Sequence, residues 1–144
     1  MHKVADEVEA AVDVPLLHLA DVTADAVRHA GLDKVALLGT RFTMEQPFYA
    51  DRLRSHGIDV LVPDDEDRAT VHDVIYDELV LGVVRDESRA AYVDVVRRLA
   101  DRGAGGVVLG CTEIELLLGP DDVDLPVFAT TRLHAVAAVD FALG

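Results

Sequence analysis

The stretch GVVLGCTEIELLL, residues 106–118, contains the only cysteine of the chain, Cys111, at the end of an apolar run. An apolar-periodic run follows at once, so we expect Cys111 between a strand and a helix. Backbone N–H groups and the positive end of a helix dipole favour a thiolate there and lower the pKa of the thiol. Thr112 and Glu113 follow in the first turn, where a hydroxyl and free N–H groups suit a substrate carboxylate. The alternative is a small buried hydrophobic residue without chemistry.

Other thiol and metal chemistries find little support in the sequence. One cysteine excludes an internal disulfide and a CxxC redox pair, and it leaves a zinc site without a cysteine partner. The sequence does not exclude a papain-like Cys/His pair, but no local signature supports one. The six histidines, at positions 2, 18, 29, 56, 72 and 134, show no HxxxH or HExxH spacing. We therefore expect no metal and no cofactor.

A second motif, VALLGTRFTMEQPFY at residues 35–49, places two hydroxyl side chains after an expected strand. Gly39 allows a tight turn there, and Thr40 and Thr43 would present their hydroxyls at the end of the strand. Thr43 and Gln46 also have capping-box spacing, so a helix-capping role for Thr43 is as well supported as ligand binding.

Five short apolar segments read as strands buried on both faces, with longer amphipathic segments between them. The expected strands are 14–19, 34–39, 59–63, 106–110 and 126–130. Helices are expected between them, among them one over 64–82 and one over 87–102. This alternation predicts an α/β fold, in which a parallel sheet of about five strands has helices on both faces.

Ligands of such sheets bind beyond the carboxyl ends of the strands. The expected topology gathers seven polar residues at that edge: Asp21, Thr40, Asp64, Cys111, Thr112, Thr130 and Thr131. Residues 1–12 form an amphipathic helix that no strand precedes. We therefore divide the chain into an orphan helix at 1–13, an α/β domain at 14–130 and a closing helix at 131–144.

The composition limits the partners. The chain has 144 residues and a formal net charge of −14, which argues against nucleic acid and anionic membrane surfaces as partners. No apolar run approaches the roughly 18 residues of a transmembrane helix. The consecutive acids of PDDEDRATVHDVIYDE, residues 63–78, suit the start of a helix better than a Mg²⁺ site. We expect a soluble cytoplasmic protein.

Three stretches, taken together in their order and spacing, indicate a protein family more specifically than any one motif does alone. They are VALLGTRFTMEQPFY, IDVLVPDDEDRATVHDVIYDELVLG and RGAGGVVLGCTEIELLL. Together they resemble the cofactor-independent aspartate/glutamate racemase family, in its aspartate racemase-like and broad-specificity branch. The resemblance implies two similar α/β domains, each supplying one cysteine to a cleft between them. One thiolate removes the α-proton of an amino acid, and the opposite thiol protonates the other face.

By this resemblance Cys111 is the second catalytic thiol and Glu113 assists its proton transfer. Thr112 would help to bind the substrate carboxylate, and Thr40 and Thr43 match the loop at the cleft. The sequence departs from the family because the region with the first cysteine is absent, so we expect a truncated enzyme whose own activity stays open. Val80 stands where aspartate-specific members carry a lysine, which favours a less acidic substrate.

Two alternatives remain. One is a one-thiol decarboxylase or α-proton exchange enzyme of the same superfamily, and the other is a non-catalytic flavodoxin-like binding module. Apolar faces intended for a second domain would lie exposed in a shortened chain. We therefore also expect a homodimer or a higher oligomer.

Overall fold

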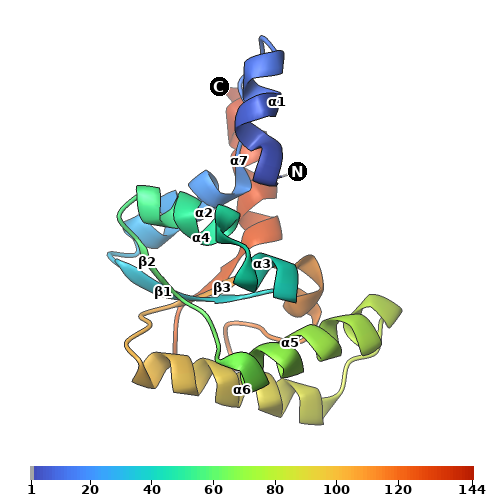
Figure 1. The fold of residues 1–144 in the computed structure, drawn as a ribbon. Coiled ribbons are helices and arrows are strands. Elements are labelled where there is room, and N and C mark those ends of the chain that lie inside the picture. The colour runs from blue at the N-terminus through green and yellow to red at the C-terminus, as the bar shows by residue number, and fades with distance from the viewer. Residues whose placement is uncertain (1) are drawn as a thin grey trace.

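Four strands form one parallel sheet in the order β2-β1-β3-β4 in the computed structural model, which describes residues 2–144 (Figure 1). The strands are β1 Lys34–Leu38, β2 Asp59–Leu61, β3 Val107–Leu109 and β4 Val127–Ala129. In the central strand β1, Ala36 lies opposite Leu61 of β2 and Val107 of β3. The predicted α/β class with a parallel sheet is confirmed, with four strands in place of about five.

The prediction of a strand at 14–19 is wrong. Residues 14–18 form neither strand nor helix, and a helix begins at Leu19. Leu16 and Leu17 are half-buried beside Ala5 instead of pairing with a strand. His18 then caps the helix, because its Nδ1 accepts the N–H of Ala20 at 3.1 Å. An apolar run this short fits a strand or a buried connector equally well, and only the available neighbours decide.

Helices cover both faces of the sheet. On one face lie α2 Leu19–His29 and α4 Pro47–Ser55, and on the other lie α5 Asp65–Asp77 and α6 Asp86–Asp101 (Figure 1). The remaining helices are η1 His2–Val4, α1 Ala5–Ala11, α3 Arg41–Glu45, η2 Leu79–Leu81, η3 Thr112–Leu116 and α7 Thr130–Leu143. The helix expected over 64–82 is divided into α5 and η2, because the backbone dihedral angles of Glu78, between them, are not helical.

The central strand β1 is buried on both of its faces. Val35 and Leu37 pack with α2 and α4, whereas Ala36 and Leu38 pack with α5 and α6. All four side chains are fully buried. This two-sided burial explains why the strand is a continuous apolar run in the sequence. It also fixes the position along the sheet at which β1 ends, after Leu38.

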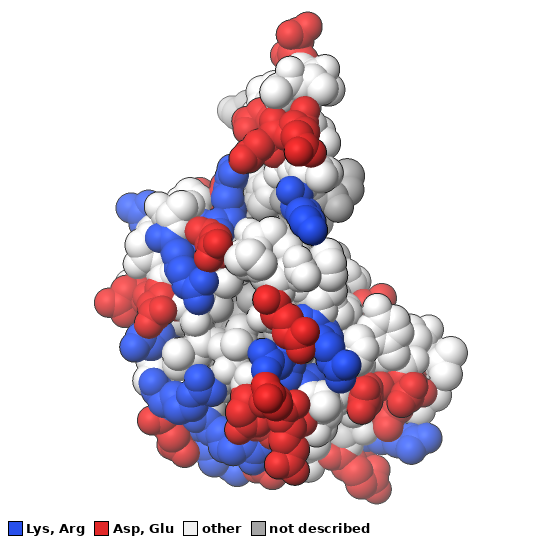
Figure 2. Space-filling view, in the orientation of Figure 1, with Lys and Arg blue, Asp and Glu red and all other residues white. Residues whose placement is uncertain are grey.

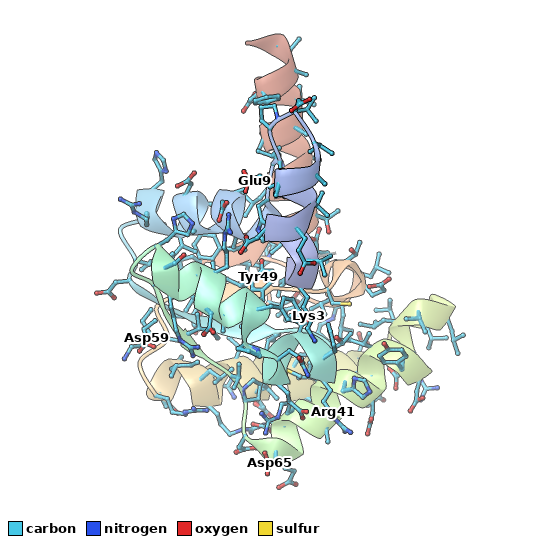
Figure 3. All side chains as sticks on the ribbon, turned by 45° about the horizontal axis from the view of Figure 1, so that its top comes forward. Lys3, Glu9, Arg41, Tyr49, Asp59 and Asp65 are labelled. Carbon is cyan, nitrogen blue, oxygen red and sulfur yellow. The ribbon has the colours of Figure 1, made fainter. Side chains whose placement is uncertain are left out.

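Helices α1 and α7 extend from the body in the same direction and form a projecting arm, seen at the top of Figure 1. The base of α7 packs against α2. Farther along α7 several apolar side chains are more than half exposed: Val136, Val139, Phe141 and Leu143. Glu9 of α1 and Lys3 of η1 are both exposed, with Glu9 on the arm and Lys3 nearer the body (Figure 3).

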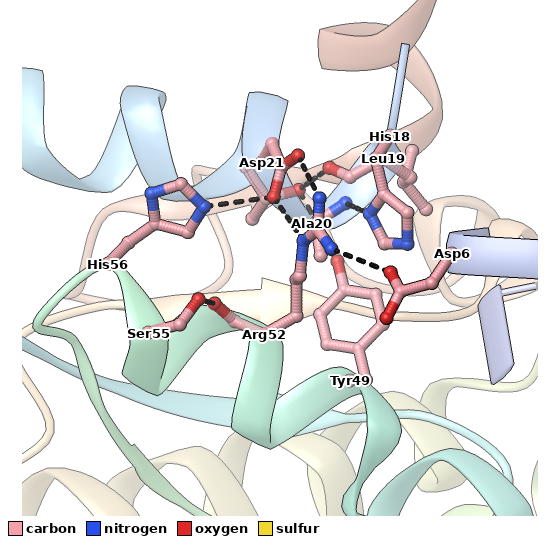
Figure 4. Close-up of polar contacts among 10 residues, drawn as sticks. Asp6, His18, Leu19, Ala20, Asp21, Tyr49, Arg52, Ser55 and His56 are labelled. Atoms are coloured by element: carbon pink, nitrogen blue, oxygen red, sulfur yellow. Dashed lines mark hydrogen bonds and ion pairs between the residues drawn. The ribbon is translucent and has the colours of Figure 1, made fainter. Parts of the chain in front are cut away.

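A charged network joins the arm to the body (Figure 4). Arg52 of α4 binds Asp21 of α2 through two hydrogen bonds of 2.7 and 2.8 Å. His56 approaches the same carboxylate at 2.9 Å, and Arg52 also reaches Asp6 of α1 at 3.4 Å. The hydrogen bond from Arg52 is the main reason that the pKa of Asp21 is lowered to about 2, against the opposing effect of burial.

Charged side chains of both signs are interspersed over the lower body, and acidic side chains dominate on α1 (Figure 2). Arg98 of α6 pairs with Asp67 of α5 at 2.6 Å, and Arg68 lies 3.7 Å from Glu45. Much of the surface charge is therefore paired locally. Within residues 2–144, no helix has both the length and the apolar character needed to cross a membrane.

Replacing Gly106 by alanine is expected to lower the free energy of unfolding by about 1–3 kcal/mol, because a side chain overfills the core here. An added Cβ would lie 2.7 Å from Cε2 of Phe128 and 3.2 Å from the carbonyl oxygen of Pro126. Urea unfolding measures the change. The control Gly119→Ala, with its nearest atom 3.6 Å away on Asp122, should stay within about 0.5 kcal/mol. Equal losses in both variants would contradict the packing argument.

Replacing Asp21 by asparagine is expected to cost about 1 kcal/mol at neutral pH, a value reduced for the partial exposure of the pair. The folded pKa of about 2 lies below the ordinary 3.8, so the stabilisation is present above about pH 4. It is lost as the pH falls towards 2. Urea unfolding of the two proteins across this window should show the difference shrink. The surface control Asp51→Asn should change stability by less than about 0.5 kcal/mol throughout.

Candidate active site

An open pocket of about 600 Å³ lies at the carboxyl ends of β1, β3 and β4. Its lining includes the five residues that the sequence singled out: Thr40, Thr43, Cys111, Thr112 and Glu113. Helix α7 supplies a further wall through Thr130, Thr131, His134, Ala135 and Ala138, and Leu19 and Gly110 complete the lining. Parallel strands end at one edge of a sheet, so residues that are far apart in the sequence meet here.

Cys111 lies two residues after the end of β3 and is half-buried in the pocket wall. Its Sγ donates a hydrogen bond of 2.9 Å to Oε2 of Glu113, which is two residues further along the chain. The thiol and the carboxylate therefore form a pair in which a proton can move along one hydrogen bond.

The predicted lowering of the Cys111 pKa is wrong. Burial in the pocket wall, followed by the hydrogen bond to Glu113, raises the pKa of the thiol to about 12. The segment after Cys111 is η3, a five-residue 3-10 helix, and not the longer helix whose dipole was expected to favour the thiolate. Because a carboxylate lies beside the sulfur, a second negative charge there is disfavoured. Cys111 is therefore a protonated thiol at neutral pH.

The second wall of the pocket is the turn after β1. Thr40 caps α3, since its Oγ1 accepts the N–H of Thr43 at 3.4 Å, and the two hydroxyl oxygens lie 3.3 Å apart. The capping role considered for Thr43 with Gln46 therefore belongs to Thr40. Both threonines are half-buried and line the pocket, and because one hydroxyl donates to the other, the pair keeps one hydroxyl hydrogen for a ligand.

Two glycines allow this turn to lie close to Cys111. A Cβ on Gly110 would lie 3.0 Å from the carbonyl oxygen of Leu38 and 3.4 Å from Cγ2 of Thr43. A Cβ on Gly39 would lie 3.1 Å from Cβ of Thr43. Thr43 thus fills the space above both strand ends, and larger residues at either glycine would displace it.

The start of α7 closes the pocket opposite the turn. Thr131 donates from its backbone N–H to Oε1 of Glu115 at 3.0 Å and from its hydroxyl to Thr112 at 3.4 Å. Thr130 has a different role, because its buried hydroxyl donates to the carbonyl oxygen of Leu109 at 2.7 Å. That bond fixes the base of α7 on the end of β3. Thr112 and Thr131 are exposed and face solvent at the pocket.

His134 is the polar lining residue that the sequence patterns do not single out, because it is one of six scattered histidines. It follows Thr130 by four residues, which places both on one face of α7. Ala138 follows after four more and also lines the pocket. The available signal was this spacing from a threonine already expected at the edge of the sheet.

Two of the residues expected at this edge do not reach the pocket. Asp21 lies in the first turn of α2 and is bound there by Arg52 of α4. It does not follow a strand, because residues 14–18 are a connector. Asp64 caps α5 by accepting the N–H of Asp67 at 3.1 Å. Val80, where the resemblance implied a contact with the substrate, lies in η2, is 48% exposed and is outside the pocket lining. Within residues 2–144, no three or more histidine, cysteine or acidic side chains are grouped so as to hold a metal ion.

Solved structures and sequence relatives match the chain over most of its length. A candidate Asp/Glu racemase of Yersinia pestis matches with a TM-score of 0.96 and 53% identity over 100% of this chain. An aspartate racemase homologue of Pyrococcus horikoshii OT3 matches with a TM-score of 0.93 and 33% identity over 99% of it. An uncharacterised protein from the pnlA 3′ region of Pectobacterium carotovorum subsp. carotovorum is 34% identical over 106 residues, which are 72% of this chain and 67% of that protein.

The match extends over only part of the two solved relatives, since the chain covers 63% of each of them. Within the chain itself the agreement includes both the sheet and the helices of the arm. The family model described as Asp/Glu/Hydantoin racemase matches residues 1–138. The chain therefore belongs to the Asp/Glu/hydantoin racemase family.

Proposed function

We propose that this chain carries the Cys111 half of a cofactor-independent amino-acid racemase site. The observation that carries the proposal is the 2.9 Å hydrogen bond from Cys111 to Glu113 in a pocket lined with threonine hydroxyls. Membership of the racemase family supports an amino acid as the substrate. The thiol would exchange a proton with the α-carbon of that amino acid.

The proton transfer balances within the pair. When the substrate carbanion is protonated, the S–H bond of Cys111 breaks, its proton forms the new C–H bond and the electron pair stays on sulfur. In the reverse direction the thiolate takes the α-proton, and the C–H electron pair stays on carbon. Movement of the thiol proton to Glu113 generates the thiolate without changing the net charge of the pair. The raised pKa then makes this thiolate a stronger base.

The threonines are suited to the substrate carboxylate. Thr40 and Thr43 together have one hydroxyl hydrogen left, and Thr112, next to the thiol in the chain, has another, so the pocket can donate from both places. Such donors would also stabilise the negative charge that spreads onto the carboxylate when the α-proton leaves. Thr130 is not part of this set, because its hydroxyl is bound to Leu109.

Inversion needs a second acid or base on the opposite face of the planar carbanion. The 144 residues contain one cysteine, so a second thiol must come from outside this sequence or from a second copy of the chain. We therefore propose complete racemisation only for an assembly that supplies that group. The homo-oligomeric state and the cytoplasmic location stay predictions.

A one-thiol reaction is the second candidate, and the raised pKa of Cys111 favours it. A protonated thiol at neutral pH can deliver a proton to an enolate after decarboxylation of a malonate. It can also return a proton to the face from which it was removed, which gives exchange without inversion. A non-catalytic binding module is less well supported, because it gives no role to the Cys111–Glu113 pair.

Solvent deuterium exchange tests the proposal. In D2O the chain is expected to catalyse α-proton exchange of its amino acid, observed by NMR on a panel of amino acids with chiral chromatography of each product. Cys111→Ala and Cys111→Ser should lower the rate by a factor on the order of 100 or more, with unchanged circular dichroism. Exchange with inversion indicates a second acid, and exchange with retention indicates a one-thiol site. Exchange that persists in both variants would exclude Cys111.

Replacing Glu113 by glutamine is expected to lower the pKa of Cys111, because the carboxylate that accepts the thiol proton and repels the thiolate is removed. Burial still raises the pKa, so the shift is partial. Alkylation by iodoacetamide, followed across the alkaline pH range, measures it directly. Glu113→Gln should react faster than the wild type at about pH 8, whereas the exposed control Glu87→Gln should not. A slower reaction would show that Glu113 stabilises the thiolate.

A further inference from the structure

The imidazole of His134 lies between two pockets. One is the candidate active site, and the other is an apolar pocket of about 160 Å³ that is lined in part by Ala5, Val8 and Leu17. Nε2 of His134 lies 2.9 Å from the carbonyl oxygen of Leu17, which lines the apolar pocket and not the active site. The Nε2 edge of the ring is therefore turned towards the connector between α1 and α2.

The partner of Nε2 determines the tautomer. A carbonyl oxygen only accepts hydrogen bonds, so Nε2 must carry the hydrogen, and Nδ1 of the neutral ring is left as an acceptor. Within residues 2–144, Nδ1 has no hydrogen-bond partner. The ring thus has one anchored nitrogen, and because His134 also lines the active-site pocket, Nδ1 is the acceptor that it can offer there.

The polar side chains around the thiol each already make a hydrogen bond within the chain. Glu113 accepts the thiol hydrogen of Cys111, and Thr40 accepts the N–H of Thr43. Thr112 accepts the hydroxyl of Thr131. An α-ammonium group brings N–H donors only, and Nδ1 of His134 is a neutral acceptor that no other group of the described chain occupies.

We propose that Nδ1 of His134 binds the α-ammonium group of the substrate, an inference that rests on the proposed amino-acid chemistry of the pocket. A neutral acceptor is suited to this role for an electrostatic reason. It holds the ammonium group without cancelling its positive charge, and that charge stabilises the carbanion that forms on the adjacent α-carbon. The Leu17 carbonyl acts as the positioning group, because it fixes the tautomer and the orientation of the ring.

The test compares ligands that differ only by the α-amino group. The pairs are L-aspartate with succinate, L-glutamate with glutarate and L-leucine with 4-methylpentanoate, so both acidic and apolar side chains are covered. Binding to the wild-type chain and to His134→Gln is measured by NMR titration. Glutamine keeps an N–H donor near the position of Nε2 but has no counterpart of Nδ1. His29→Gln, an exposed substitution on α2, is the matched control.

For the pair that binds, His134→Gln should lower the affinity for the amino acid by roughly tenfold or more, as expected for the loss of a hydrogen bond to a charged group. The affinity for the desamino compound should change by less than about twofold, and His29→Gln should change neither affinity. Equal weakening of both partners would make His134 a structural residue and overturn the proposal. Unchanged binding of the amino acid by His134→Gln would overturn it as well.

Spectra of the wild-type chain with ¹⁵N-labelled histidine give a second readout that needs no stable variant. At about pH 8, above the usual histidine range, the His134 ring should be the Nε2–H tautomer. The Nδ1 resonance should shift with the amino acid and not with its desamino partner. A protonated Nδ1 in the free chain would overturn the proposal. If no amino acid of the panel binds the wild type, the proposed function itself fails, and this inference fails with it.

Discussion

The pairing of β1 with β3 brings the two walls of the site together. Leu38 lies opposite Leu109 in the register, and the N–H of Gly110 continues the ladder to the carbonyl oxygen of Leu38 at 2.7 Å. Two residues beyond this last pair the chain reaches the pocket, at Thr40 on one side and Cys111 on the other. Because both strands are buried on both faces, neither can slide without exposing its apolar side chains to water.

The protonation of Cys111 follows from where this pairing leaves the sulfur. The thiol is drawn into the pocket wall, and the short turn of η3 brings Glu113 back against it at 2.9 Å. Burial and the neighbouring carboxylate both disfavour the thiolate, and they outweigh the backbone contact that favours it. The same arrangement that makes Cys111 a weak acid makes its thiolate a strong base, which suits removal of a proton from carbon.

Helix α7 connects the site to the arm. Its first turn is fixed to β3 through Thr130, and its next turn presents His134 to the pocket. His134 in turn bonds to Leu17, in the connector that follows α1. One helix therefore closes the pocket, contributes polar groups to it and continues outward into the exposed apolar part of the arm. A contact made by the arm and a contact made by a ligand in the pocket would therefore both involve α7.

Local sequence patterns are sufficient to predict the α/β class, the helices on both faces and the family, because buried parallel strands and the Gly-Cys-Thr-Glu motif both leave such patterns. They also indicate Thr40, Thr43, Cys111, Thr112 and Glu113, which follow the ends of strands. Three features become visible only in the folded chain: residues 14–18 form a connector, the pKa of the Cys111 thiol is raised, and His134 lines the pocket. Those outcomes depend on neighbours distant in sequence or on burial, and local periodicity encodes neither.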